Sequence, residues 1–162
     1  MWGRKSLEAI AVLRDEFNAA LKNAMKARDQ RRVSTLRLIN AAIMERETRG
    51  ATRIEAGDAD ILDVLQKMIK QRQESADIYD KGGRPELAQQ EREEMAIISG
   101  YLPKQLSEEE AKAAIAAAIK DTGAASMKDM GKVMAALKER HAGQMDFAKA
   151  SGLVKGMLVP PI

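Results

Sequence analysis

The sequence predicts an all-α protein in which a bundle of about four helices precedes a small domain of three helices. Apolar residues recur at spacings of three and four, which is the period of a helix with one buried face. No segment of convincing length alternates apolar and polar residues as a half-buried strand would. Glycine and proline stand between the helical segments, where they end one helix and begin the next.

The first two helices are expected on either side of a short turn. The first runs from Leu7 to Ala27. Asp29 is a suitable N-cap for the second helix, which ends before Gly50, because its carboxylate accepts hydrogen bonds from the free amides of the first turn. Their expected core positions are Leu13, Phe17, Leu21, Ala24, Met25, Val33, Leu36, Asn40 and Ile43.

The third and fourth helices follow a loop over residues 50–57. Asp58 is the expected cap of the third helix, and Gly82 and Gly83 stop it. Pro85 suits the first position of the fourth helix, because its ring fixes φ at a helical value. The apolar stripe of the third helix contains Ile61, Leu62, Leu65, Met68, Ile69, Arg72 and Ala76. That of the fourth helix contains Leu87, Ala88, Glu91, Met95 and Ile98.

Residues 100–106 interrupt the helical pattern and form the expected hinge between two domains, with Tyr101-Leu102-Pro103 packed at the junction. The chain is thus divided into an N-terminal extension (1–11), an N-terminal helical domain (12–99), the hinge and a C-terminal helical domain (107–162).

Capping patterns define the three helices of the C-terminal domain. Ser107 and Glu110 form an S-x-x-E capping box for the fifth helix, which Gly123 closes. Ser126 and Asp129 have capping-box spacing at the start of the sixth helix, which Gly143 ends, and Asp146 caps the seventh. The expected core positions of these two helices are Met130, Val133, Met134, Leu137, Leu153, Val154, Met157 and Leu158.

The composition excludes several classes of site. The 162 residues include no cysteine and one histidine, which rules out disulfides, thiolate or multi-histidine metal sites and cysteine nucleophiles. We therefore expect no metal and no cofactor. No run of 18 apolar residues occurs, and charged residues from Glu8 onward interrupt any signal-peptide core, so we expect a cytoplasmic protein without a membrane segment.

No catalytic motif is recognisable. The only histidine, His141, lies just before Gly143 at an expected helix end, so we interpret it as a helix cap. Walker A, GxGxxG and GxSxG motifs are missing. We interpret the carboxylates as surface groups or helix starts: Glu45, Glu47, the run 91–94 and the run 108–110. The chain is therefore expected not to be an enzyme by itself.

Basic residues are the stronger signal. The chain carries 27 basic and 24 acidic side chains, and from Met127 onward it has 6 basic against 3 acidic. The candidate phosphate-binding residues there are Lys128, Lys132, Lys138, Arg140, Lys149 and Lys155. Another cluster contains Arg28, Arg31, Arg32 and Arg37, with only Asp29 against it. For both groups the alternative is a solvated helix face with no partner.

Five short segments, in this order, resemble one family. They are Thr35-Leu36-Arg37, residues 70–75, Gly83-Arg84 followed by Leu87 and Glu91, residues 101–107, and residues 128–134. Together they identify a chain similar to the stand-alone members of the GatB/YqeY-domain family, over residues 13–158. Residues 1–11 extend past the usual family start, and Gln144 stands where many members have an arginine.

The resemblance implies an all-α protein whose C-terminal part is similar to the tail of the B subunit of the glutamine-dependent tRNA amidotransferase. That tail helps to hold tRNA. The family therefore carries the label of a carbon–nitrogen ligase with glutamine as amido-N-donor, although stand-alone members lack the kinase-like and amidase portions. By this resemblance, Lys128, Lys132 and Lys155 would face an RNA backbone, with Gly131 permitting close approach.

Three arginines near apolar stripes are expected to form ion pairs between helices. Arg37, Arg72 and Arg84 are predicted to pair with Glu45, Glu74 or Glu91. A surface patch is the alternative for Arg72.

Two hypotheses for the function result. The first is a non-catalytic, tRNA-associated binding module that uses the basic C-terminal helices, with tRNA rather than DNA as its partner. The alternative is a protein–protein adaptor that docks on an amidotransferase or an aminoacyl-tRNA synthetase without contacting RNA.

Overall fold

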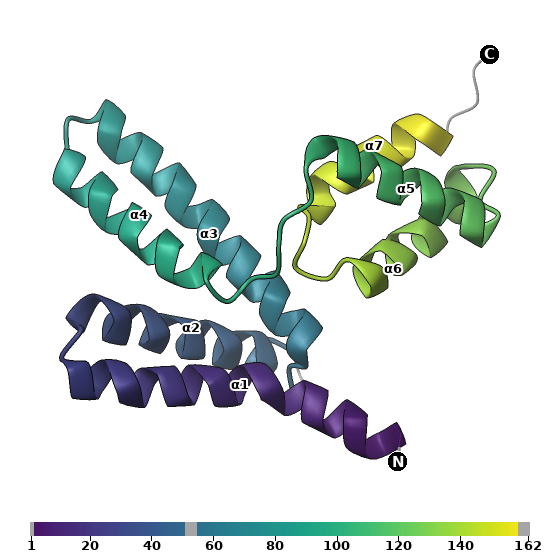
Figure 1. The fold of residues 1–162 in the computed structure, drawn as a ribbon. Helices are drawn as coiled ribbons and strands as arrows, with labels where there is room; N and C mark the ends of the chain where they lie inside the picture. The colour runs from purple at the N-terminus through teal and green to yellow at the C-terminus, as the bar shows by residue number, and fades with distance from the viewer. Residues whose placement is uncertain (1, 51–54, 159–162) are drawn as a thin grey trace. The chain divides into compact units, whose positions relative to one another are not determined.

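The chain forms two compact units, residues 1–102 and residues 103–162 (Figure 1). The computed structural model describes residues 2–50 and 55–158, with side chains from residue 13 onward. Over these residues it contains seven α-helices, one short 3-10 helix and no strand. The all-α class is thus confirmed. The division between the units falls inside the segment expected as a hinge.

The first unit consists of two helical hairpins. Its helices are α1 (Trp2–Ala27), α2 (Gln30–Thr48), α3 (Asp58–Lys81) and α4 (Pro85–Ser99). α1 pairs with α2 and α3 pairs with α4, while α2 also packs against α4 and α1 against α3 (Figure 1). The first helix begins at Trp2 rather than at Leu7, since no proline in residues 2–7 breaks the helix.

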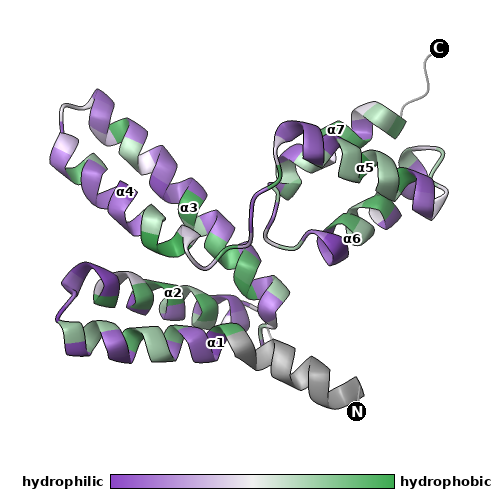
Figure 2. Ribbon diagram, viewed as in Figure 1, coloured by the Kyte–Doolittle hydropathy of each residue, from purple (hydrophilic) through white to green (hydrophobic). Residues whose placement is uncertain are grey.

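The core of the first unit lies where the two hairpins meet (Figure 2). Phe17, Leu36, Ile61, Leu65 and Ile98 are fully buried there. The ring of Tyr101 packs edge-on against Phe17, with 5.0 Å between the ring centroids. Tyr101 and Leu102 therefore belong to this core although they follow the last helix of the unit.

The expected position of Met25 in the core is wrong. Met25 is 51% exposed, whereas Ala24 is buried. Consecutive helical residues are rotated by about 100°, so the burial of Ala24 turns Met25 outward. Asn40 is only half-buried. The neighbouring Ile39 and Ile43 occupy the buried stripe of α2.

The expected boundaries of the helices in the first unit are largely confirmed. Asp29 caps α2, its Oδ1 accepting a hydrogen bond from the Arg32 backbone N–H at 3.1 Å. Gly82 is the C-cap of α3, and Gly83 adopts a left-handed φ of 73° that favours glycine. Pro85 is the first residue of α4. Asp58 is itself the first residue of α3, and Gly57 occupies the N-cap position.

The second unit contains α5 (Glu108–Thr122), the 3-10 helix η1 (Met127–Asp129), α6 (Met130–Arg140) and α7 (Phe147–Leu158). Both hydrogen bonds of the capping box between Ser107 and Glu110 are present. Gly123 ends α5 with a left-handed φ of 66°. The three α-helices enclose a separate core that includes Ile115, Val133, Leu137, Val154 and Leu158.

The start of the sixth helix differs from the expectation. Ser126 accepts a hydrogen bond from the Lys128 backbone N–H and so caps η1. Asp129 Oδ2 accepts from the Ala125 backbone N–H at 3.0 Å, pointing back out of the helix. Because the Ser126 hydroxyl accepts from Lys128 rather than from Asp129, the predicted capping box is replaced by a 3-10 turn, and α6 begins at Met130.

Candidate nucleic-acid interface

The six candidate basic residues of the second unit all have exposed side chains. They are distributed over η1, α6 and α7: Lys128, Lys132, Lys138, Arg140, Lys149 and Lys155. Arg140 forms an ion pair with Asp121, with 2.9 Å between Nη1 and Oδ2. The five lysines form no ion pair with any other residue in the described part of the chain. Their charges are therefore available to a partner.

Two nearby carboxylates are engaged by the backbone instead. Asp146 caps α7, accepting a hydrogen bond from the Ala148 backbone N–H at 2.9 Å, as the sequence predicts. The hydrogen bond from the Ala125 backbone N–H lowers the pKa of Asp129 below its ordinary value, with Lys132 contributing a smaller effect. Asp146 thus caps α7, whereas the Asp129 carboxylate bonds to the backbone that precedes α6.

The outer face of α7 combines glycines with lysines. Ala150, Val154 and Leu158 face the core. At about 100° per residue, Gly152 and Gly156 point away from that core. A Cβ atom added to either glycine would meet nothing within 4 Å.

On the same helical wheel, Lys149 and Lys155 lie on opposite flanks of the two glycines. We call these four residues the α7 glycine–lysine face. Sequence reasoning identified the lysines but missed the glycines. The spacing of Gly152 and Gly156, four residues apart and out of phase with the apolar stripe, was the available signal.

The basic residues before and within α6 do not share one helix. Lys128 belongs to η1, whereas Lys132 lies in the first turn of α6. A Cβ on Gly131 would also meet nothing within 4 Å, so this backbone is accessible from outside. Lys128 and Lys132 are therefore two exposed lysines on either side of a helix start.

His141 is a helix cap, as predicted. Its backbone N–H donates to the Leu137 carbonyl at 2.8 Å at the end of α6. Its ring Nδ1 lies 3.1 Å from Oε1 of Gln144. The Gln144 side chain also donates to the Lys104 carbonyl at 3.3 Å. Gln144 thus connects the turn before α7 to the segment before α5.

Of the three predicted interhelical arginines, only Arg72 forms an ion pair with another described residue. Its Nε lies 2.9 Å from Oε2 of Glu94, and the two side chains are 13% and 10% exposed. The partner is Glu94 rather than Glu74 or Glu91, because Glu94 is the buried carboxylate of α4. Glu91 is half-buried, and Arg37 and Arg84 are exposed. None of these three residues forms an ion pair with another described residue, so the ion pairs predicted for Arg37 and Arg84 are not found there.

Two glutamates interpreted as surface groups are buried. Glu47 is 3% exposed and Glu94 is 8% exposed. Glu47 forms an ion pair with Arg14 and accepts a hydrogen bond from the Ala56 backbone N–H at 2.9 Å. It lies four residues after Ile43, so the buried stripe of α2 continues to it. Continuing that spacing along the sequence would have revealed its burial.

The described residues include no group of three or more His, Asp or Glu side chains suited to holding a metal ion. Among the same residues, no helix is both long and apolar enough to cross a membrane.

Comparison with known proteins places these features in a family context. A family model described as Yqey-like protein matches residues 14–158. The protein named "Altered inheritance of mitochondria protein 41, mitochondrial", from Eremothecium gossypii, is 34% identical over 95 residues. The match covers 59% of this chain and 49% of that relative, so the chain spans about half of the relative's length.

Proposed function

The chain belongs to the YqeY-like family, and from this premise we propose that it is a non-catalytic binding module that holds tRNA through its C-terminal unit. Five of the six candidate basic residues in that unit are exposed lysines that form no ion pair with another described residue. Such lysines bind phosphates by neutralising their charge and releasing counterions. Phosphate contacts of this kind position a nucleic acid without reading its sequence.

The observation that carries the proposal is the α7 glycine–lysine face. Each glycine inside a helix costs about 1 kcal/mol relative to alanine. Neither Gly152 nor Gly156 has a neighbour that a Cβ would strike, so packing within the chain does not account for this cost. The glycines allow an external backbone to come close, at a distance at which Lys149 and Lys155 reach its phosphates.

The choice of tRNA follows from the similarity of this part of the family to the tail of the amidotransferase B subunit. The amidotransferase label, with glutamine as amido-N-donor, describes the multisubunit enzyme. Amide transfer by this chain alone is not part of the proposal. A cytoplasmic location is part of it, while the printed name of the Eremothecium relative assigns that protein to the mitochondrion.

The experiment measures the binding of the full chain to labelled bulk tRNA by fluorescence anisotropy at two salt concentrations. If about three phosphates are neutralised, affinity falls by roughly one and a half log units between 50 and 200 mM salt. The double variant Lys149→Gln/Lys155→Gln is expected to lower the slope of log affinity against log salt by about two.

The matched control is Lys22→Gln/Lys81→Gln, which removes the same charge from two exposed lysines of α1 and α3 that form no ion pair with another described residue. This variant should bind like the unmodified chain. Absence of binding at 50 mM salt, or equal loss in both double variants, would contradict the proposal.

A second candidate function is an adaptor that docks on an amidotransferase or an aminoacyl-tRNA synthetase. The observation in its favour is exposed apolar surface on the second unit, where Met127 is 39% exposed. Met157, whose predicted place in the core is wrong, is 44% exposed. Co-purification of such an enzyme that survives ribonuclease and moderate salt would favour the adaptor over the RNA-binding module.

A further inference from the structure

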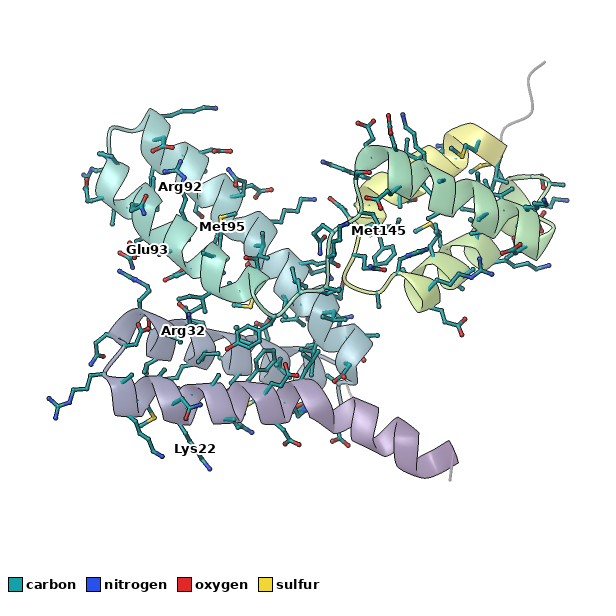
Figure 3. The ribbon with its side chains drawn as sticks, viewed as in Figure 1. Lys22, Arg32, Arg92, Glu93, Met95 and Met145 are labelled. Atoms are coloured by element: carbon teal, nitrogen blue, oxygen red, sulfur yellow. The ribbon has the colours of Figure 1, made fainter. Side chains whose placement is uncertain are left out.

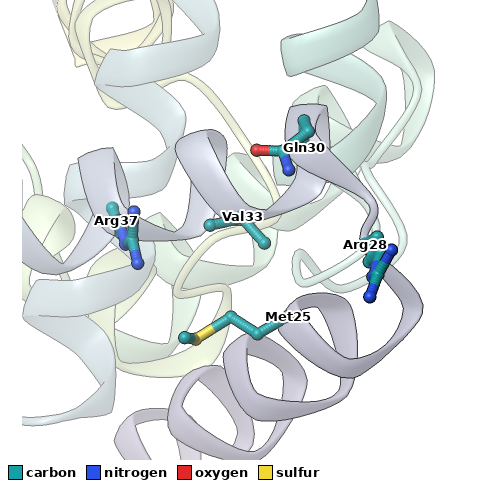
Figure 4. Close-up of a pocket in the computed structure, with 5 residues that line it drawn as sticks. All are labelled: Met25, Arg28, Gln30, Val33 and Arg37. Carbon is teal, nitrogen blue, oxygen red and sulfur yellow. The ribbon is translucent and has the colours of Figure 1, made fainter.

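A hollow of about 200 Å³ lies at the turn between α1 and α2 in the first unit (Figure 4). It is lined by Met25, Arg28, Gln30, Val33 and Arg37. Two arginines thus line the hollow together with one amide and two apolar side chains, and Met25 and Val33 lie between Arg28 and Arg37 in Figure 4. Sequence analysis placed Arg28 and Arg37 in one cluster with Arg31 and Arg32, and the structure separates that cluster into two pairs.

Arg31 and Arg32 are engaged with carboxylates. Arg31 Nε lies 3.3 Å from Oε2 of Glu93 on α4, and its Nη1 lies 3.8 Å from Oε1 of Glu94. Arg32 Nε lies 3.6 Å from Oδ2 of Asp29.

The other two arginines have no such partner. Arg28 and Arg37 are exposed, and the structure gives neither an ion pair with another described residue. The carboxylate adjacent to Arg28, Asp29, is already used: one oxygen caps α2 and the other faces Arg32. The hollow thus contains two positive charges and no acidic lining residue.

The backbone at Arg28 supplies an independent observation. Arg28 has a φ of 57°, and it is the single non-glycine residue with positive φ in the described chain. Its N–H donates to the Met25 carbonyl at 3.2 Å, and the Asp29 N–H donates to the Ala24 carbonyl at 3.0 Å. This is the Schellman end of α1, where glycine is the usual residue. An arginine in this position is strained, so the stability of α1 does not account for its presence.

We propose that the Arg28–Arg37 hollow binds a single phosphate group. Guanidinium groups present paired N–H donors that match phosphate oxygens, and two of them supply the charge that a phosphate requires. The volume is below the roughly 300 Å³ at which pockets for drug-sized ligands begin, so a phosphate group fits better than a larger molecule.

Two sources of the phosphate share this chemistry. One is free phosphate or a phosphate monoester, and the other is the phosphodiester backbone of a nucleic acid. Inorganic phosphate and an oligouridylate without terminal phosphate serve as the two probes. Each is titrated into the unmodified chain at constant ionic strength, while the backbone amide signals of Arg28, Gln30 and Arg37 are followed by NMR.

We expect at least one probe to cause saturable chemical-shift changes at these three amides, and we expect chloride to cause none. A response to inorganic phosphate alone would indicate that the hollow binds free phosphate or a monoester. A response to the oligonucleotide alone would indicate that it binds a phosphodiester. Arg28→Gly and Arg37→Gln should each weaken binding about tenfold or more, as expected for loss of a charge-assisted hydrogen bond. Lys81→Gln, which removes a charge from the last turn of α3, should change it less than about twofold.

Arg28→Gly separates binding from folding, because glycine suits a positive φ. This variant should melt at a temperature equal to or a few degrees above that of the unmodified chain, so weaker binding would not result from misfolding. No response to either probe would overturn the proposal, as would binding that Arg28→Gly and Arg37→Gln leave intact. Because the site lies in the first unit, its failure is distinguishable from failure of tRNA binding by the second.

Discussion

The two units of the chain use charged residues in opposite ways. In the first unit, Arg72 pairs with Glu94 and Arg14 pairs with Glu47, and both glutamates are buried. In the described part of the second unit, the ion pairs are exposed and most lysines have none. The units differ little in net charge, with 18 basic and 17 acidic residues in 1–102 and 9 and 7 in 103–162.

The two units thus differ in whether their charged side chains form ion pairs, and not in how many charged residues they contain. Charged side chains that are paired and buried serve the structure, whereas exposed, unpaired ones can bind a ligand. A buried ion pair gives little net stability, but removing one partner leaves an uncompensated charge in the interior. An exposed lysine costs little to remove. The first unit should therefore respond to charge substitutions through its stability, and the second should respond through binding.

The largest expected effect is on stability and comes from Glu94→Ala. This change leaves Arg72, only 13% exposed, without its carboxylate and should destabilise the first unit by about 3 kcal/mol. Native-state hydrogen exchange measures each unit separately: protection at Leu36 and Leu65 should fall, while protection at Leu137 and Val154 should not.

The control for Glu94→Ala is the adjacent residue on α4. Glu93 is exposed (Figure 3), and its carboxylate forms an ion pair with Arg31 Nε at 3.3 Å. Glu93→Ala should cost less than about 0.5 kcal/mol. Similar losses in the two variants would show that burial does not distinguish these ion pairs, and the comparison between the units would fail.

An effect of intermediate size is expected at the α7 glycine–lysine face. Gly152→Ala and Gly156→Ala should each stabilise the second unit by up to about 1 kcal/mol, since alanine is the better helix former. Both should weaken tRNA binding in the anisotropy measurement, because each Cβ projects into the space that the RNA backbone is proposed to occupy.

The control for these glycine variants is the reverse substitution, Ala117→Gly, at an exposed position of α5. It should destabilise the second unit by a similar amount and leave tRNA affinity unchanged. If affinity instead follows stability in all three variants, the α7 glycine–lysine face is not a contact surface.

Local chemistry made most of the fold predictable from the sequence. The cap at Asp29, the capping box at Ser107 and the glycine stop at Gly123 each depend on residues within one helical turn. The burial of Glu47 was missed because its charge suggested solvent while its spacing from Ile43 indicated the core. Here the spacing was the better guide.

The candidate sites were less predictable, because pairing depends on tertiary contacts. Arg28, Arg31, Arg32 and Arg37 look equivalent in the sequence, yet the hairpin α3–α4 supplies carboxylates to Arg31 and none to Arg28 or Arg37. The exposed glycines of α7 were missed for a related reason. Whether a Cβ would strike a neighbour becomes known only when the helices are packed.

The smallest expected effect concerns acid stability and Asp63 on α3. Burial alone would raise the pKa of Asp63, but hydrogen bonds from Arg46 and Lys67 outweigh it, so the pKa lies below the ordinary value of 3.8. A carboxylate whose pKa is lower in the folded state adds stability above its ordinary pKa, and this stability is lost as the pH falls through the folded value. Asp63 is about one-third exposed, so the contribution is less than about 1 kcal/mol.

Asp63→Asn should therefore lower the hydrogen-exchange stability of the first unit at pH 7, and the difference should disappear at a pH well below 3.8. Asp77→Asn on the same helix is the control, because Asp77 is exposed and accepts a hydrogen bond from the neutral Gln73. A constant difference across this pH range would assign the effect of Asp63 to packing rather than charge. A difference that vanishes in acid would show that paired charge in the first unit contributes to its stability, in contrast to the exposed lysines of the second.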